Sequence, residues 1–305
     1  MKFNIACMGT RANLNYQRDW LLLVTYALQD LGHAVVMSHN RLDSGSTINI
    51  ICHGVHDLSS EEMHHIINSD VNYGAIPGEI IINGTVNNRS QFDEEMGLPW
   101  TDFSGGYLPY LKGADFVWCV MEHNMRELPK YGVNPAGFLK FGFHPRLQEI
   151  KLIPNEYRDN DVYFFGLLTE ARSRILKVIK QKGLKILLHD YGNPTLAFMR
   201  NSNINRSRIV LNLAQDVGFR HISGLRIVYL ATNCCYGLSE SVGIDDGDYL
   251  KFSDVANPNE IAERCLEVIE TKAYLNLAEK YHEMIKKFPM KNYLEELLDE
   301  TFASI

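Results

Sequence analysis

The chain has 305 residues, of which 46% are hydrophobic and 22% are charged. This length suits two domains, and the composition is that of a globular protein rather than a disordered one. No apolar run reaches the roughly 18 residues that a membrane-spanning helix needs. The net charge of −7 is concentrated in residues 1–150, which contain 10 Lys and Arg against 16 Asp and Glu. That acidic half argues against nucleic acid as a partner, because phosphate binding needs clustered cations.

The first half of the sequence alternates short apolar strands with amphipathic helices. Strands are predicted at 4–8, 34–37, 48–52, 79–82, 116–121 and 137–141, and helices at 18–31 and after a capping sequence at 59–62. This alternation predicts a parallel sheet with helices on both faces.

A polar, proline-containing segment at 152–161 is typical of a linker, and the pattern then restarts. Strands are predicted at 161–166, 185–188, 208–213 and 235–239, and helices at 170–182, 224–232, 258–271, 273–287 and 292–302. The predicted fold is α/β, with two doubly wound domains at 1–150 and 151–288. Residues 289–305 are expected to return to the first domain as an apolar-striped helix. Ligands of such sheets bind at the carboxyl ends of the strands, so two facing domains would share a cleft.

The cysteines show no paired metal-ligand spacing, and most lie in strand-like apolar runs. They are Cys7, Cys52, Cys119, Cys234, Cys235 and Cys265. We therefore expect reduced core thiols, no metal site and a cytoplasmic location.

Several catalytic motifs are missing from the sequence. It contains no Gly-x-Gly-x-x-Gly, no phosphate-loop lysine motif, no His-Glu-x-x-His and no Gly-x-Ser-x-Gly. Dinucleotide, nucleoside-triphosphatase, zinc-protease and serine-hydrolase interpretations therefore have no support. Cations do cluster, since 12 of the 20 Lys and Arg in residues 151–305 fall between Arg158 and Arg226. Such a cluster suits either a solvated helix face or a pocket for a small anion.

Residues 161–240 contain a recognisable series of motifs. They include Asp161-Val-Tyr-Phe-Phe-Gly166, Ser223-Gly-Leu-Arg226-Ile-Val-Tyr229 and Cys235-Tyr-Gly-Leu-Ser239-Glu240. The series resembles the nucleotide-sugar-binding domain of GT-B-fold glycosyltransferases of the bacterial group-1-like branch. The resemblance implies two facing Rossmann-like domains and metal-independent transfer of a hexose-like sugar to an acceptor that it does not identify. The donor would be a nucleotide diphosphate sugar, a UDP-sugar first, and no cofactor is implied.

The resemblance also points to donor-site residues. A strand ending in glycine lets backbone approach a diphosphate, helix N-termini favour anions, and arginine grips phosphate in a bidentate way. The candidates are Gly166, Arg172, Arg174, Asp190, Tyr191, Ser223, Gly224, Arg226 and Glu240.

The chain departs from the family at one pair of positions. Many retaining members carry a Glu-x7-Glu pair here, and His221 and Tyr229 occupy the two positions in this sequence. The sugar and ribose contacts of that pair therefore do not transfer. Glu240, after the next strand, can instead meet the ribose hydroxyls.

The catalytic base is expected from the first domain, because transfer to a hydroxyl needs a group that accepts its proton. Eight of the eleven histidines lie in residues 1–150, and strand ends are the best-placed positions. The candidates are His53, Asp57, Glu122, His123 and Asp19.

Two other functions stay open at this point. One is a nucleotide-sugar epimerase of the same fold, and the other is a non-catalytic GT-B binding module, which the missing carboxylate pair allows. A DNA-base glycosyltransferase has little support from the acidic first half. The sequence leaves the nucleotide, sugar, acceptor, stereochemical outcome and oligomeric state undetermined.

Overall fold

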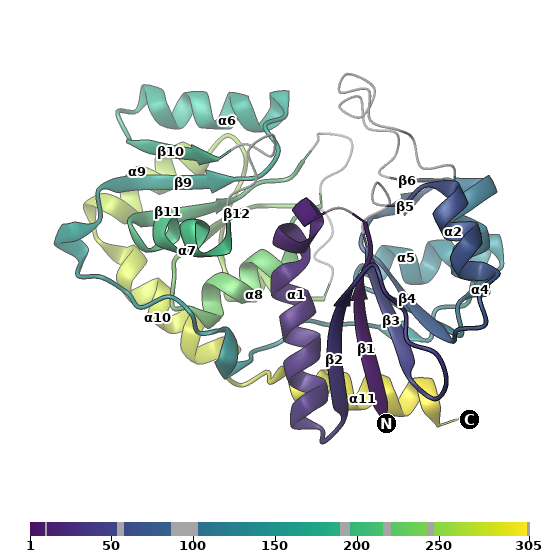
Figure 1. Cartoon of the computed structure of the whole chain (residues 1–305). Coiled ribbons are helices and arrows are strands. Elements are labelled where there is room, and N and C mark those ends of the chain that lie inside the picture. Colours follow the sequence, from purple (N-terminus) through teal and green to yellow (C-terminus); the bar gives the residue numbers. More distant parts are fainter. Residues whose placement is uncertain are drawn as a thin grey trace. The chain divides into compact units, whose positions relative to one another are not determined.

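The computed structural model describes residues 1–9, 11–53, 58–86, 103–189, 196–215, 221–242 and 247–303, without the side chains of 11–16, 53 and 60. Contacts between residues divide the chain into two compact units (Figure 1). Unit 1 comprises Met1–Phe141 and Met290–Ile305, and unit 2 comprises Gly142–Pro289. Residues 142–150, which the sequence analysis placed in the first domain, thus belong to unit 2.

Unit 1 contains a six-stranded sheet in which all neighbouring strands are parallel. Its order is β2 (Ala34–His39), β1 (Lys2–Cys7), β3 (Ile48–His53), β4 (Tyr73–Pro77), β7 (Phe116–Cys119) and β8 (Gly137–Phe138). A hairpin of β5 (Ile81–Ile82) and β6 (Thr85–Val86) is separate from it.

Helices cover both faces of this sheet. They are α1 (Arg11–Asp30), α2 (Ser60–Ile67), α4 (Leu108–Gly113), α5 (Glu122–Glu127) and α11 (Met290–Phe302). The expected capping sequence does begin α2, because the Ser59 hydroxyl accepts from the Glu62 N–H and the Glu62 carboxylate accepts from the Ser59 N–H.

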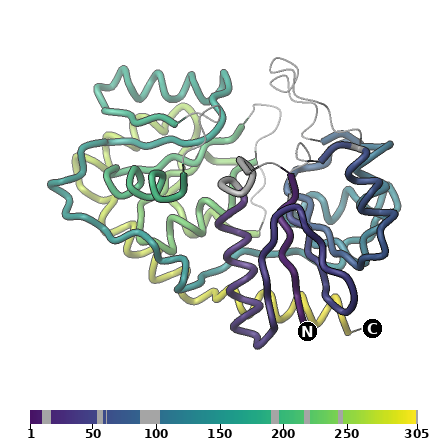
Figure 2. The backbone as a smooth tube through the Cα atoms, in the orientation of Figure 1, coloured from purple at the N-terminus to yellow at the C-terminus, as the bar shows by residue number. Residues whose placement is uncertain are grey.

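The C-terminal helix α11 packs within unit 1, beside α1 and β8 (Figure 2). Its apolar stripe is buried at Leu294, Leu297 and Leu298. Trp118 Nε1 donates to Thr301 Oγ1 at 2.8 Å, which ties the helix to β7.

Unit 2 contains a five-stranded parallel sheet. Its order is β10 (Ile186–His189), β9 (Asn160–Phe165), β11 (Ser207–Asn212), β12 (Gly237–Glu240) and β13 (Asp254–Ala256). Its helices are α6 (Glu170–Gln181), α7 (Ala197–Asn205), α8 (Gly224–Thr232), α9 (Ile261–Glu270) and α10 (Ala273–Ile285). Side chains of α6, α9 and α10 share one buried cluster, and those of α7 and α8 share another.

The predicted α/β class with two separate, doubly wound parallel sheets is confirmed. The strand predicted at 79–82 is wrong, since only Ile81–Ile82 is extended and it pairs in the β5–β6 hairpin outside the sheet. Sequence reasoning missed β4, whose Gly74 and Pro77 are unusual inside a strand. Gly74 is needed because a Cβ there would lie 2.1 Å from the Phe116 ring.

Candidate functional site

Gly166 marks the carboxyl end of β9 in unit 2. Its φ of 135° lies in the region that favours glycine, and a Cβ there would lie 3.4 Å from Arg226 Nη2 and 3.9 Å from Arg172 Nη1. The chain therefore turns at Gly166 with two guanidinium groups alongside. This is the point at which ligands bind in open parallel sheets.

Arg226, in the first turn of α8, reaches back over the ends of two strands. Its Nη2 donates to the Phe165 carbonyl at 2.8 Å, and its Nη1 makes longer contacts with the Leu211 carbonyl and Asn212 Oδ1, at 3.4 and 3.5 Å. Its Cζ lies 4.2 Å from the centroid of the Phe165 ring. These contacts fix the plane of the guanidinium. Among the described residues, its Nε–H has no hydrogen-bond acceptor.

The charge of Arg226 is not neutralised by a carboxylate among the described residues, since its polar contacts are with carbonyl and amide oxygens. Burial, together with the positive charges of Arg172 and Arg200, lowers the pKa of Arg226 to about 9. A cation that is disfavoured by burial and by like charges is stabilised when an anion binds beside it.

Arg172 contacts backbone with all three guanidinium nitrogens. Nε donates to the Ala214 carbonyl at 3.0 Å, Nη1 to Leu167 at 2.8 Å and Nη2 to Leu213 at 2.7 Å. Burial lowers its pKa to about 10, against the opposing effect of Glu240. Arg172 thus joins the segments after β9 and β11 and adds a buried positive charge beside Gly166.

The N-terminus of α8 lies at the same edge of the sheet. Ser223 caps the helix, its hydroxyl accepting from the Arg226 N–H at 3.2 Å. Packing requires a glycine at the neighbouring position 224, because a Cβ on Gly224 would lie 2.2 Å from the Tyr249 ring. The capped helix directs its positive end toward the edge that carries Gly166.

Two further sequence candidates already have partners within the protein. Arg174 is exposed on α6 and forms an ion pair with Glu170 at 3.4 Å, four residues earlier in the helix. Glu240 is buried at the end of β12, where its Oε2 accepts from the Ala214 N–H at 3.0 Å. Glu240 therefore already holds the backbone segment that Arg172 also contacts.

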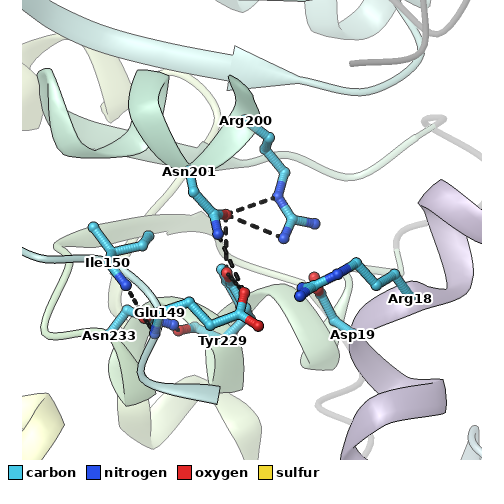
Figure 3. Close-up of polar contacts among 8 residues, drawn as sticks. All are labelled: Arg18, Asp19, Glu149, Ile150, Arg200, Asn201, Tyr229 and Asn233. Carbon is cyan, nitrogen blue, oxygen red and sulfur yellow. Dashed lines mark hydrogen bonds and ion pairs between the residues drawn. The ribbon is translucent and has the colours of Figure 1, made fainter. Parts of the chain in front are cut away.

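Tyr229, which replaces the expected carboxylate, is a buried member of a hydrogen-bonded network (Figure 3). Its hydroxyl lies 2.8 Å from Asn201 Oδ1 and 3.1 Å from Glu149 Oε2. The Arg200 Cζ lies 4.6 Å from the centroid of its ring. The backbone N–H of Glu149 donates to Asn233 Oδ1 at 2.7 Å. This network ties α7 and α8 to the segment that precedes β9.

Sequence reasoning missed Glu149, Arg200 and Asn201. Helix α7, which carries two of them, has a weakly amphipathic polar sequence and was not predicted. Glu149 lies in a stretch without a motif. No sequence signal would have joined these three residues to Tyr229.

In unit 1, Glu122 and His123 begin α5 directly after β7, at the carboxyl edge of that sheet. The neighbouring Asn124 is fully buried, accepting from the Ile81 N–H at 2.9 Å and donating to the Glu79 carbonyl at 2.8 Å. Asn124 therefore holds the β5–β6 hairpin. His123 Nε2, in contrast, is buried and has no hydrogen-bond partner among the described residues.

Asp19 is buried within α1 and lies 3.2 Å from Arg18 Nη1 (Figure 3). Asp19 lies in α1 whereas Glu122 and His123 begin α5, so these candidates come from different elements of unit 1. His53 ends β3, two strands from β7 in the sheet, and its side chain is outside the described atoms. Residues Asp57, Asp190 and Tyr191 also lie outside the described residues.

No family model matches the sequence, and no curated protein matches it. The structure, however, is similar to solved glycosyltransferases. An alpha-glucosyltransferase in complex with UDP and a 13-mer DNA containing a HMU base shares 10% identity at a TM-score of 0.58, over 98% of this chain and 99% of that chain. An alpha-glucosyltransferase in complex with UDP shares 8% identity at a TM-score of 0.60, over 97% and 100%. TarM of S. aureus, solved with UDP among its ligands, shares 12% at 0.57, over 91% of this chain and 58% of that chain.

The chain has the GT-B fold. The resemblance inferred from residues 161–240 is thereby confirmed at the level of fold. Arg172 and Arg226 both lie at the carboxyl edge of the unit 2 sheet. The positive charge that they bring to this edge calls for a chemical explanation.

Three further findings concern metal sites, membrane-spanning helices and cysteines. Within the described ranges, no group of three or more His, Cys, Asp or Glu side chains is placed to hold a metal ion. The same ranges of the GT-B chain include no helix whose length and hydropathy would let it cross a membrane. All six cysteines are free thiols, and five of them are buried.

Proposed function

We propose that the chain is a glycosyltransferase that moves a sugar from a nucleoside diphosphate sugar, a UDP-sugar first, to an acceptor hydroxyl group. The observation that carries this proposal is Arg226, a partly buried guanidinium that lies beside Gly166 and has no carboxylate partner among the residues that the structure describes. UDP in the complexes of the structural neighbours supports uridine as the nucleoside.

The chemistry of the donor fits this edge of the sheet. A diphosphate needs positive charge, N–H donors and a backbone without side chains in its way. Arg226 supplies the charge, the α8 N-terminus supplies a positive helix end, and Gly166 supplies the open backbone. Arg172 adds charge through space while its own N–H groups hold the backbone.

The same groups can assist the reaction itself. Negative charge builds up on the leaving diphosphate as the glycosidic bond breaks, and fixed cations stabilise the transition state more than the ground state. Arg226 is held in place by the Phe165 carbonyl and ring, so little reorganisation is needed. We infer that this charge offsets the leaving group without a bound metal ion.

For the acceptor proton, His123 is the base that the contacts favour. Its Nε2 is buried without a partner, whereas a structural histidine in the interior normally satisfies both ring nitrogens. Imidazole titrates near neutrality, which suits a general base. Asp19 is less suited because it already contacts Arg18.

Binding and transfer test this function separately. A thermal-shift series with UDP, GDP, dTDP, ADP and CMP comes first, since a ligand at 100 times its Kd stabilises by about 2.7 kcal/mol. Radiolabelled UDP-glucose is then incubated with candidate acceptors, with and without EDTA. We expect UDP to stabilise the protein. We also expect sugar transfer to proceed equally with and without EDTA.

Each other outcome has a clear meaning. Stabilisation by none of the nucleotides contradicts the proposed donor site. Binding of UDP without turnover on any donor favours a non-catalytic module, and conversion of the UDP-sugar to its epimer without an acceptor favours an epimerase.

The acceptor series includes DNA as well as saccharides. The expectation against nucleic acid came from the acidic first half of the sequence. A neighbour that matches along nearly its whole length was solved with DNA, so a duplex oligonucleotide belongs in the series. Transfer to DNA would make that expectation wrong.

A further inference from the structure

A histidine is held by two hydrogen bonds at the carboxyl end of β10, the strand beside β9. Tyr163 Oη lies 3.0 Å from His189 Nδ1, and Asn203 Nδ2 lies 3.2 Å from the same nitrogen. The Tyr163 and His189 rings meet edge to face, with centroids 5.8 Å apart. Tyr163 lies in the motif that ends at Gly166, whereas His189 and Asn203 belong to no motif of the sequence.

These contacts determine which ring nitrogen carries the proton. Tyr163 is fully buried, and burial raises its pKa to about 12, so its O–H stays protonated and needs an acceptor. The Asn203 amide N–H lies beside the same nitrogen, so we assign His189 Nδ1 as the acceptor of the Tyr163 hydroxyl proton. In the neutral ring the proton is then on Nε2.

His189 therefore offers a hydrogen-bond donor in a fixed direction. The residue is partly exposed, and its Nε2 has no hydrogen-bond partner among the residues that the structure describes. Because Nδ1 is held from the interior side by a buried tyrosine, the opposite edge of the ring is the one left for a ligand.

The His189 imidazole lies at the same edge of the sheet as Arg172 and Arg226. His189 is in register with Phe165 across neighbouring parallel strands, which are about 4.8 Å apart. The Phe165 ring carries the Arg226 guanidinium and lies with its centroid 5.3 Å from that of Tyr163. Imidazole and guanidinium thus flank Phe165 at the same edge of the sheet. A nucleotide, whose base and phosphates are joined through one ribose, suits two such neighbouring groups.

We propose that His189 Nε2–H donates to a carbonyl oxygen of the donor's nucleobase and so selects a base with a carbonyl over one with an amino group there. This inference rests on the proposed function and adds the residue that reads the base. Uracil presents a carbonyl where cytosine presents an amino group. An N–H donor facing an amino group leaves both groups unsatisfied, which disfavours CDP.

The test compares UDP with CDP, which differ only at that edge of the base. Calorimetric Kd values are measured for the wild type, His189→Ala, His189→Gln and, as a control that removes an exposed histidine from unit 1, His65→Ala. We expect the wild type and the control to prefer UDP about tenfold, the effect of one hydrogen bond whose loss leaves a buried group unpaired. His189→Ala should lower that ratio to about two, and His189→Gln, which keeps an amide N–H, should retain part of it.

Tyr163 acts here as a positioning residue, and its role has its own readout. Nitrogen-15 chemical shifts of His189 should show the Nε2–H form in the wild type and a mixture of both forms in Tyr163→Phe. The UDP-to-CDP ratio should fall in that variant as well, whereas a purely structural tyrosine would change stability without moving the ratio.

The outcomes separate this inference from the proposed function. Equal Kd values for UDP and CDP in the wild type, an unchanged preference in His189→Ala, or an Nδ1–H form of His189 would each overturn it. The proposed function would stand in all three cases, because UDP still binds. A wild type that binds neither nucleotide overturns both.

Discussion

The carboxyl edges of the two sheets place their polar side chains in different ways. In unit 2, Arg172 and Arg226 are held by backbone carbonyls at the ends of β9 and β11, beside Gly166. In unit 1, Glu122 and His123 begin a short helix, and Asp19 lies in a different helix, α1, beside Arg18. In unit 2, backbone carbonyls at the strand ends thus position both arginine side chains. In unit 1, the candidate side chains lie on separate helices.

The two edges also differ in charge balance. Charged side chains of unit 1 find partners nearby: Asp19 contacts Arg18, and Glu127 contacts Lys130. Arg226 contacts no carboxylate within the described part of the chain, and burial and its arginine neighbours lower its pKa. A group whose charge or hydrogen-bonding capacity is unmatched is costly unless a ligand matches it, so Arg226 and the unpaired His123 Nε2 are the groups to test.

The largest effect is expected from Arg226. Arg226→Ala should lower kcat/KM about 10²- to 10³-fold, the scale of one lost charge-stabilising donor. Arg226→Lys should recover only part of the loss, because charge remains while the planar contact with Phe165 and the bidentate geometry are lost. Steady-state kinetics and melting temperature are measured on each variant.

A lysine on the exposed face of α6 gives the matched control. Lys177→Ala removes one cation from unit 2 and should leave turnover unchanged. If Arg226→Ala melts at a lower temperature but turns over normally below it, Arg226 belongs to the scaffold and the contrast between the two edges disappears.

The next effect tests unit 1. His123→Ala should lower kcat about 10²-fold, the lower end of what a general base contributes, while the Kd for UDP stays unchanged. Glu122→Gln, one residue earlier in α5, is the companion variant and should keep kcat near that of the wild type. A His123→Ala enzyme with normal kcat would leave the base unassigned.

A smaller effect is expected at Gly166, where conformation and contact act together. Gly166→Ala introduces a Cβ at a φ of 135° and 3.4 Å from Arg226 Nη2. We expect the Kd for UDP to rise about tenfold, because the strain of about 1–3 kcal/mol is relieved by moving the backbone that Arg226 holds.

Gly183 separates conformation from contact. It has a φ of 85°, and a Cβ there would have no neighbour within 4 Å. Gly183→Ala should therefore lower the melting temperature without changing the Kd for UDP. Equal Kd values in the two alanine variants would show that Gly166 has only a conformational role.

The contrast between units explains what the sequence could predict. The strand–helix alternation predicted both sheets, because short-range pattern determines helices and strands. The motif around Arg226 placed it with Gly166 only through the resemblance to GT-B glycosyltransferases, and the structure brings the two together by the contact of Arg226 with Phe165, 61 residues away. The same motif did not show that Arg172 is committed to three backbone carbonyls. Such contacts depend on where the segments after β9 and β11 meet, and residue spacing does not encode that.

The partner of Tyr229 was beyond sequence reasoning for a similar reason. Its hydroxyl contacts Glu149, 80 residues earlier, and Asn201 on a helix that was not predicted. Alignment with the family could state only that a carboxylate is missing there. The structure shows instead that the position holds three segments of unit 2 together.

The smallest effect therefore concerns Tyr229, one turn after Arg226 in α8. Tyr229→Phe removes only the hydroxyl that lies near Asn201 and Glu149, so it should lower the free energy of unfolding by about 1 kcal/mol. The Kd for UDP should change less than about twofold, since no step of donor binding assigned above uses that hydroxyl. Denaturant unfolding and calorimetry measure the two quantities. A tenfold weaker Kd with unchanged stability would mean that the hydroxyl contacts the donor, at the position where the sequence resemblance led us to expect a carboxylate. The site would then extend along α8 beyond Arg226.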